Sequence, residues 1–242
     1  MPRGQPDFGI YTETPVASGI SDPGEAAARL GSINVYDRRG WTVWMDDFEA
    51  PSFKWISFVS PPGALPVLVT TASWRGAQSV YLNAVAGAGG ISGMLKIFPL
   101  LRLGRLGIEF WTRGVTVSPG YLGLVFDIFD GTNQSRAEVR ADFLADTVSI
   151  VTPAGTIVID TGAFPLLALM PFVPIKIVVD MDDDTYTRLM IGHQEYDISA
   201  HALVPVGATT NRLIRAQFSL NGAAGGDSYA WLENFILTQN EP

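Results

Sequence analysis

Closely spaced carboxylates are the residues of this 242-residue chain best placed to do chemistry. Glu195 and Asp197 begin the pattern Glu-x-Asp-x-x-Glu, which sets a nucleophile and an acid on one strand for retaining glycoside hydrolysis. The pattern then fails, because Ala200 stands where the third acid belongs. Since that mechanism needs two carboxyl groups at a set separation, the sequence does not predict a hydrolase of this type.

Asp46, Asp47 and Glu49 form a second acidic group. Carboxylate oxygens of this kind can hold Ca²⁺. The alternative is structural: on a strand, Asp47 and Glu49 would face solvent, while a buried Asp46 would bond a turn and need a partner, either an arginine or a metal. We favour the structural role, so no cofactor is expected and Ca²⁺ remains the alternative.

The other candidate motifs are incomplete. The series Asp180, Asp182, Asp184 imitates the start of an EF-hand loop, but Ile191 stands where the closing glutamate belongs, so a tight hairpin turn is predicted. The glycine-rich stretch 87–93 lacks the Lys-Ser or Lys-Thr of a phosphate-binding loop. The sequence has no Gly-x-Ser-x-Gly nucleophile elbow that would make His193 or His201 part of a catalytic triad. His193 follows a glycine, so an exposed turn is predicted there. No catalytic residue is assigned, and the chain is not expected to be an enzyme.

Composition narrows the possible partners. The chain has 24 acidic and 16 basic residues, a net charge of −8, which argues against nucleic-acid binding. It has no cysteine, which excludes disulfides and thiolate metal sites. The first residues lack the apolar stretch of a secretory signal. The most apolar run, 164–179, is interrupted by Pro165, Pro171 and Pro174, so no membrane span is expected.

Short apolar or alternating runs, separated by turn residues, predict many strands. The run 135–143 alternates charged residues with apolar ones, which is typical of a strand with one wet and one buried face. Asp130-Gly131-Thr132-Asn133 and Thr152-Pro153-Ala154-Gly155 predict turns. The predicted strands are 33–37, 41–48, 55–60, 66–73, 78–85, 92–98, 105–112, 121–129, 135–143, 146–151, 156–160, 173–181, 185–191, 194–198, 211–220 and 229–238.

The N-terminal segment differs from the rest. Residues 1–40 are rich in proline and glycine and show no hydrophobic period at their start, which predicts an extended arm. One short helix is expected within it, near 22–30: Asp22 is a cap, Pro23 takes the first helical position, Glu25 closes a capping box and Gly31 ends it. The remainder, 41–242, is predicted to be a single domain.

Two runs at the ends of that domain resemble a known family. The first is Trp44-Met45-Asp46-Asp47-Phe48-Glu49, followed by Trp55, and the second is Tyr229-Ala230-Trp231-Leu232-Glu233-Asn234-Phe235-Ile236-Leu237. Together, over about residues 41–238, they resemble the concanavalin A-like, laminin-G-like jelly roll. The resemblance implies an all-β, antiparallel two-sheet jelly-roll sandwich with the first strand near the last. The same fold carries lectins, glycanases, adhesion modules and virion proteins, so it does not decide function.

The six tryptophans admit two interpretations. They could form a platform on which sugars stack, or they could be large core residues. Because the strands are so apolar, we expect most of them to be buried, with at most one or two on a binding face.

The first functional hypothesis is a non-enzymatic virion protein, such as a phage capsid decoration or tail-associated subunit made in the host cytoplasm. It would dock on other virion proteins or on copies of itself as a homo-oligomer, with neither nucleic acid nor membrane as partner. The alternative is a carbohydrate-binding, lectin-like module that binds glycans with or without calcium. Under the first hypothesis the contacts come from the arm and from apolar loops, namely Phe8, Ile10, Tyr11, Val16, Leu100, Leu101, Leu166 and Leu169.

Overall fold

The structure is a computed structural model that describes residues 36–37, 39–60, 63–74, 76–85, 90–100, 104–116, 120–164, 171–222 and 226–242. These residues belong to one compact unit, Tyr36–Pro242. The helix predicted near 22–30, and the arm as far as residue 35, lie outside the described residues. The described part of the chain contains strands and turns without a helix, and so no helix that could span a membrane.

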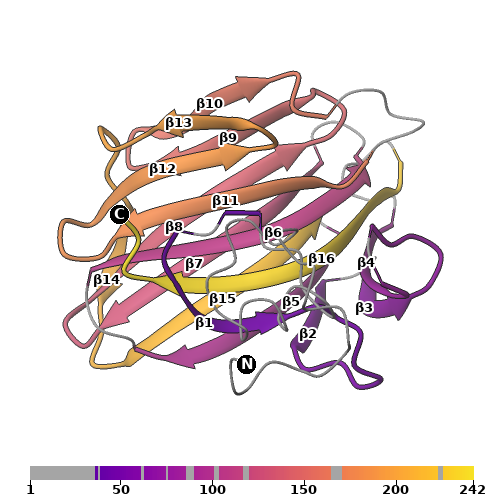
Figure 1. Cartoon of the computed structure of the whole chain (residues 1–242), viewed down its shortest axis with the longest axis horizontal. Coiled ribbons are helices and arrows are strands. Elements are labelled where there is room, and N and C mark those ends of the chain that lie inside the picture. Colours follow the sequence, from indigo (N-terminus) through magenta and orange to yellow (C-terminus); the bar gives the residue numbers. More distant parts are fainter. Residues whose placement is uncertain are drawn as a thin grey trace, which may run out of the picture. The chain divides into compact units, whose positions relative to one another are not determined.

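The strands form two antiparallel sheets that pack face to face (Figure 1). Sheet A has the order β13-β12-β11-β6-β16-β4-β3, with β1 also beside β16. Sheet B has the order β10-β9-β8-β7-β15-β5-β2, with β14 also beside β8. The bounds in sheet A are β1 Trp41–Asp46, β3 Ala64–Val69, β4 Ser79–Ala84, β6 Arg105–Val115, β11 Val173–Asp180, β12 Thr185–Ile191, β13 Gln194–Asp197 and β16 Ser228–Gln239. Those in sheet B are β2 Ile56–Ser60, β5 Ile91–Pro99, β7 Tyr121–Asp130, β8 Asn133–Asp142, β9 Thr147–Thr152, β10 Gly155–Thr161, β14 Val204–Ala208 and β15 Arg212–Asn221.

The all-β sandwich predicted from the sequence is confirmed, and the first strand does lie beside the last. Asp46 in β1 is paired with Phe235 in β16. Two predictions about strands need correction. Residues 36 and 37, part of the strand predicted at 33–37, are not in a strand. Strand β14 was not predicted, because Pro205 and Gly207 are residue types that are uncommon inside strands. It pairs with the start of β8.

The core fills the space between the sheets. Along β7 the even-numbered side chains from Leu122 to Ile128 point inward, and the inward positions of the facing strands are equally apolar. An aromatic cluster closes one end, where the rings of Trp55 and Phe235 meet edge to face at 4.9 Å. Each fully buried side chain of this size stabilises the fold by roughly 1.5–3 kcal/mol relative to its exposure.

One side chain links the sheets through the core. Tyr186, on β12 of sheet A, is fully buried. Its hydroxyl donates to the carbonyl oxygen of Val151 at 2.6 Å and accepts the N–H of Glu138 at 2.9 Å, both in sheet B. Tyr186 therefore holds β8 and β9 of sheet B against sheet A.

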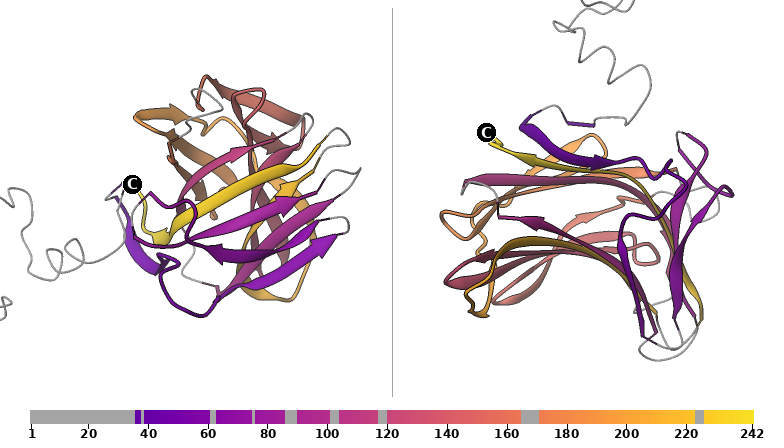
Figure 2. Two further views of the ribbon diagram at one scale, coloured as in Figure 1. Left: turned by 90° about the vertical axis from the view of Figure 1, so that its right-hand side faces the viewer. Right: turned by 90° about the horizontal axis from the view of Figure 1, so that it is seen from below.

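Sheet B is curved, and its outward face lies on the concave side of the bend (Figure 2).

Candidate functional site

The outward face of sheet B carries a regular array of polar side chains, because successive residues of a strand alternate between the two faces. Pairing across the sheet arranges them in rows. One row runs Gly93, Ser219, Gly123, Arg140 across β5, β15, β7 and β8. The row on one side contains Asn221 and Tyr121, and the row on the other contains Leu95, Gln217, Val125 and Glu138.

The first of these rows has two small residues, Ser219 and Gly123, at its middle. The ring of Phe58 covers Gly93, since a Cβ there would lie 2.1 Å from the ring Cζ. Gly123 is more open, because its nearest potential contacts are the Ser219 hydroxyl at 3.4 Å and the Tyr121 ring at 3.5 Å. We call Ser219 and Gly123 the floor. It lies between the ring of Phe58 and the guanidinium of Arg140.

Polar groups surround this floor. The Arg140 guanidinium lies 4.6 Å from the centre of the Tyr121 ring, and its Nε donates to Glu138 at 2.6 Å. Burial raises the pKa of the Tyr121 hydroxyl. Among the described residues, neither that hydroxyl nor the amide of Gln217 has a side-chain hydrogen-bond partner. The floor is thus bordered by an aromatic ring, a cation and polar groups still able to bond a ligand.

Beyond Gln217 the face is closed by an ion-paired group. Asp127 is fully buried although it points outward. Its Oδ1 accepts from Arg136 at 2.8 Å and from Gln134 at 3.1 Å, and its other oxygen pairs with Arg215. These contacts occupy the Asp127 carboxylate with protein donors, which suits a supporting role better than a catalytic one.

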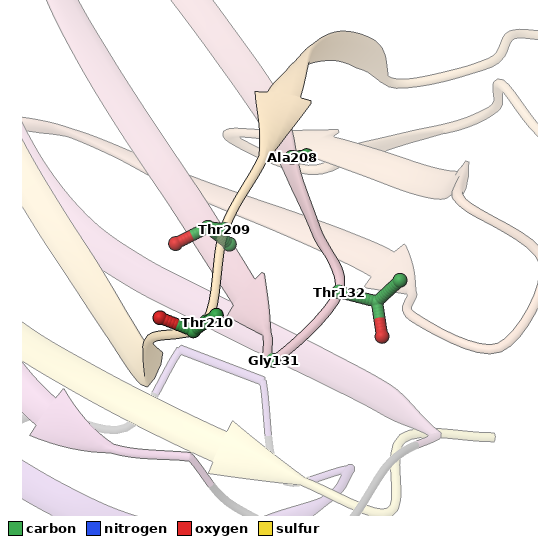
Figure 3. A pocket seen from close by; sticks show the side chains of 5 residues that line it. All are labelled: Gly131, Thr132, Ala208, Thr209 and Thr210. Atoms are coloured by element: carbon green, nitrogen blue, oxygen red, sulfur yellow. The ribbon is translucent and has the colours of Figure 1, made fainter.

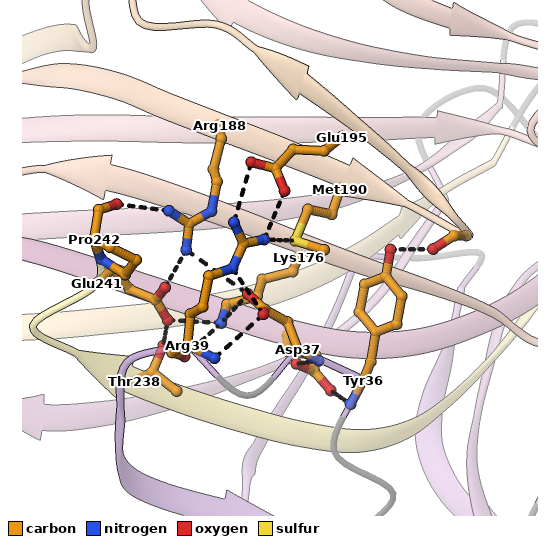
Figure 4. Close-up of polar contacts among 12 residues, drawn as sticks. Tyr36, Asp37, Arg39, Lys176, Arg188, Met190, Glu195, Thr238, Glu241 and Pro242 are labelled. Atoms are coloured by element: carbon orange, nitrogen blue, oxygen red, sulfur yellow. Dashed lines mark hydrogen bonds and ion pairs between the residues drawn. The ribbon is translucent and has the colours of Figure 1, made fainter. Parts of the chain in front are cut away.

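The outward face of sheet A has a different ion network, at the end formed by β11, β12 and β13 (Figure 4). Lys176 is fully buried and pairs with Asp37 at 2.8 Å and with Glu241 at 2.6 Å. Arg188 also pairs with Glu241, and donates to the carbonyl oxygen of Pro242 at 2.6 Å. Burial raises the pKa of Asp37, but the hydrogen bonds from Lys176 and Arg39 outweigh it and hold that pKa below its usual value. The network fastens Asp37 and the last two residues to the sheet.

Two carboxylates at this end have features of catalytic groups. Glu195, the first acid of the incomplete hydrolase pattern, lies on the edge strand β13 and pairs with Arg39 at 2.6 Å. Burial raises the pKa of Glu109 to about 7, a value typical of a general acid. The carboxylate of Glu109 is, however, buried and accepts the backbone N–H groups of Tyr36 and Asp37 at 2.6 and 3.1 Å. Both residues therefore serve to attach the chain that precedes β1.

The acidic group that suggested calcium is occupied by protein donors. Asp46 is buried and accepts the indole N–H of Trp55 at 3.1 Å and the N–H of Phe48 at 3.1 Å. Glu49 accepts the N–H groups of Ala77 and Gln78, each at 2.9 Å. Within the described residues no cluster of three or more His, Asp or Glu side chains is arranged to hold a metal. The Asp46 carboxylate has the structural role favoured from the sequence, but its partners are Phe48, Trp55 and Lys54, where an arginine or a metal was expected.

The remaining motifs form turns. Asp180 accepts the N–H of Asp182 at 3.0 Å, and Asp184 has a φ of 50°, so the predicted hairpin joins β11 to β12. His193 is exposed in the turn before β13, as predicted. A shallow depression of about 580 Å³ lies where the turn after β7 meets residues 208–210 (Figure 3). Small uncharged residues line it and offer no charged group to a ligand: Gly131, Thr132, Ala208, Thr209 and Thr210.

Most of the interaction residues predicted from the sequence stay predictions. Leu100 is half-buried and packs against the core. The tryptophan prediction is only partly right: Trp55 and Trp111 are buried, Trp44 and Trp231 are intermediate, and Trp41 and Trp74 are exposed. Apart from Leu100, the interaction residues predicted from the sequence lie outside the described residues, namely Phe8, Ile10, Tyr11, Val16, Leu101, Leu166 and Leu169.

The floor on sheet B was not predicted from the sequence. Alternation placed Arg140 and Glu138 on the wet face of their strand, but nothing local indicated which residues of β15 and β7 would lie beside them. Gly123 and Ser219 are far apart in the chain and meet only through strand pairing. No motif in the sequence marks them.

Comparison with known proteins supports the fold. No protein-family model and no curated protein sequence matches the chain. Among solved structures, an endo-β-1,4-glucuronan lyase from the fungus Trichoderma reesei matches with a TM-score of 0.58 and 8% identity, over 82% of this chain and 95% of that one. At this identity the match shows a shared fold and nothing further.

Other structures match less closely. The cellulose-induced protein Cip1 has a TM-score of 0.48 and 14% identity, over 81% of this chain and 97% of that one. The CBM22-1 xylan-binding domain of Xyn10C from Paenibacillus barcinonensis has a TM-score of 0.43 and 10% identity, over 84% of this chain and 96% of that one.

Proposed function

We propose that this domain is a carbohydrate-binding module, and that a glycan chain lies on the outward face of sheet B across the floor of Ser219 and Gly123. The observation that carries the proposal is a floor without bulky side chains, where a Cβ on Gly123 would meet nothing nearer than 3.4 Å, bordered by polar groups that have no side-chain hydrogen-bond partner among the described residues. Sugars bind where an aromatic ring and hydrogen-bonding side chains converge on a concave surface. Tyr121 and Gln217 supply these on either side.

The surrounding ion pairs support this role. Asp127 and Glu138 are each paired with arginines, so the face is preorganised without a pair of free carboxylates. A binding module needs such fixed donors, because rigid side chains lose less entropy when a ligand arrives. The proposal favours the lectin-like alternative over a phage virion subunit, for which the fold and the structural matches offer no support.

A polysaccharide lyase is the competing enzyme function, since one structural neighbour is named as a glucuronan lyase. Elimination would need a base at the floor, and the nearest candidate is the Tyr121 hydroxyl. Burial raises the pKa of this hydroxyl, which makes the phenolate base harder to form at neutral pH. Binding without cleavage is thus the better match to the site.

The test is a glycan array with the full chain, run with calcium and with a chelator. The same array is run with the variant Gly123→Gln, which fills the floor. The backbone at this position has no positive φ, and an added Cβ would meet only contacts of 3.4 Å or more. Leu144→Gln, at an exposed position in the turn between β8 and β9, is the matched control. We expect array binding that the Gly123 variant loses and the control keeps.

A negative array under both conditions, or equal binding by the folded Gly123→Gln variant, would contradict the proposal. Incubation of the same protein with polyglucuronate provides the separate test for a lyase. Appearance of the unsaturated, ultraviolet-absorbing product would show that the domain is a lyase and not a binding module.

A further inference from the structure

The outward face of sheet A has an aromatic end as well as an ionic end. Pairing between β6, β16, β4 and β3 aligns Arg113, Trp231, Tyr81 and Val67 in one row. The rings of Tyr81 and Trp231 are 5.2 Å apart and tilted by 43°. Tyr229 stacks on Tyr81 at 5.9 Å with an angle of 14°. We call Tyr81, Tyr229, Trp231 and Arg113 the sheet A platform.

Arg113 is the unusual member of this platform. Its guanidinium lies 4.8 Å from the centre of the Trp231 ring and 5.7 Å from that of Phe172. Within the described residues it makes no hydrogen bond and no ion pair. The other arginines discussed above are all paired with carboxylates. Among the described residues, the guanidinium of Arg113 therefore contacts aromatic rings and has no polar partner.

Two further groups on this end have unmet hydrogen-bonding capacity. The indole nitrogen of Trp231 and the amide oxygen of Asn83 are buried without a partner in the described structure. Asn83 is paired with Tyr229, directly beside the platform row. A buried polar group without a partner costs free energy, so such groups call for an explanation, and a ligand that bonds them would supply one.

We infer that the sheet A platform is a second carbohydrate site, one that binds an acidic sugar unit through its carboxylate. A planar guanidinium matches a planar carboxylate with two parallel hydrogen bonds, and the ring faces on either side hold its orientation. Tyr81 and Tyr229 offer ring faces on which the sugar stacks. Arg113 supplies the positive charge of this platform, while the Asp227 carboxylate at its border is engaged by the Tyr229 hydroxyl at 2.8 Å.

This second site is separate from the floor on sheet B, because the platform lies on the outward face of the other sheet. The inference is therefore independent of the proposed function. A domain with both sites would hold two chains, or two parts of one chain, on opposite faces.

The experiment is a titration of the full chain with a β-1,4-linked glucuronic acid hexasaccharide, followed by calorimetry and by tryptophan emission. The uncharged glucose hexasaccharide of the same linkage is the matched ligand. Four proteins are compared: the native chain, Arg113→Gln, Arg113→Lys and the floor variant Gly123→Gln. Thermal unfolding of each protein shows that it is folded.

We expect the native chain to bind the acidic hexasaccharide with a change in tryptophan emission and with affinity that falls as salt rises. Arg113→Gln should weaken that binding at least tenfold, and Arg113→Lys should weaken it less, because it keeps the charge and loses the planar fork. The emission change at the platform should persist in Gly123→Gln.

Three outcomes would overturn the inference. One is a native chain with no affinity for the acidic hexasaccharide. The second is equal binding by native protein and folded Arg113→Gln. The third is loss of all acidic binding in Gly123→Gln, which would place the acidic sugar on sheet B and leave the proposed function standing without the second site.

Discussion

The carboxylate of Glu241 lies 2.6 Å from Nζ of Lys176, and neither side chain is exposed to solvent. Arg188 pairs with the same carboxylate. Glu241 therefore neutralises two cations on a face of the protein where water does not reach them. Removing its charge leaves both cations with Asp37 as their nearest remaining anion.

Glu241→Gln should destabilise the domain by about 3–5 kcal/mol, because breaking a buried ion pair leaves charge uncompensated. Glu195→Gln removes the same charge from an exposed pair with Arg39 and should cost less than about 1 kcal/mol. Denaturant titration of both variants measures the difference. Equal midpoints for the two would show that the Glu241 pairs contribute nothing to folding.

Glu109 should make stability fall as pH rises from about 4.5 to 7. Burial raises its pKa in the folded state to about 7 from 4.5, so in this range the folded protein binds more protons than the unfolded chain. The sign is opposite to that of Asp37, whose lowered pKa removes stability as pH falls below its ordinary value of 3.8. Glu109→Gln cannot titrate and should flatten the stability curve between pH 4.5 and 7, by up to about 3 kcal/mol.

Unfolding free energies of the native chain and of Glu109→Gln, taken at half-unit steps from about pH 4 to 8, check this. The Glu195→Gln variant serves as the control and should keep the native slope above about pH 5. Parallel curves for native and Glu109→Gln would mean that Glu109 titrates normally.

Asp127 lies on the same outward face as the floor on sheet B, with the row of Gln217 between them. Asp127→Asn should destabilise the domain by about 2–3 kcal/mol, since it weakens charged hydrogen bonds to Arg136 and Arg215 at a fully buried position. It should also weaken any glycan binding, because the freed arginines can turn away from the face. Asp183→Asn, in the exposed turn between β11 and β12, is the matched control.

Thermal unfolding and glycan binding, measured on the same samples, test this. An Asp127→Asn protein as stable as the control would show that the ion pairs of Asp127 with Arg136 and Arg215 are not needed for the fold.

Tyr186→Phe should cost about 1–3 kcal/mol. The substitution keeps the ring in the core, but it removes the acceptor for the N–H of Glu138 and the donor to the carbonyl of Val151. Tyr196→Phe, where the hydroxyl bonds Gln194 at the surface, should be nearly neutral. Amide hydrogen exchange gives the site-specific result: the N–H of Glu138 should exchange faster in Tyr186→Phe and at the native rate in Tyr196→Phe.

Some features of this protein follow from the sequence alone. Alternation along the run 135–143 predicted a strand with the correct buried face, because a buried face must be apolar wherever it lies. The resemblance of the first and last runs to one family predicted that β1 would lie beside β16. Ala200, in place of the third acid, is enough by itself to break the hydrolase pattern, since a methyl group can neither donate nor accept a proton.

The two proposed binding faces depend on tertiary structure. Gly123 becomes part of a floor only because β7 pairs with β15 in the register that sets it opposite Ser219. Arg113 lies over an aromatic ring only because Trp231 is its partner across β6 and β16. A one-residue change of register would turn these side chains to the other face, and register is decided by the packing of the whole core. Local sequence specifies which residues a strand offers, and the pairing of distant strands decides which of them meet.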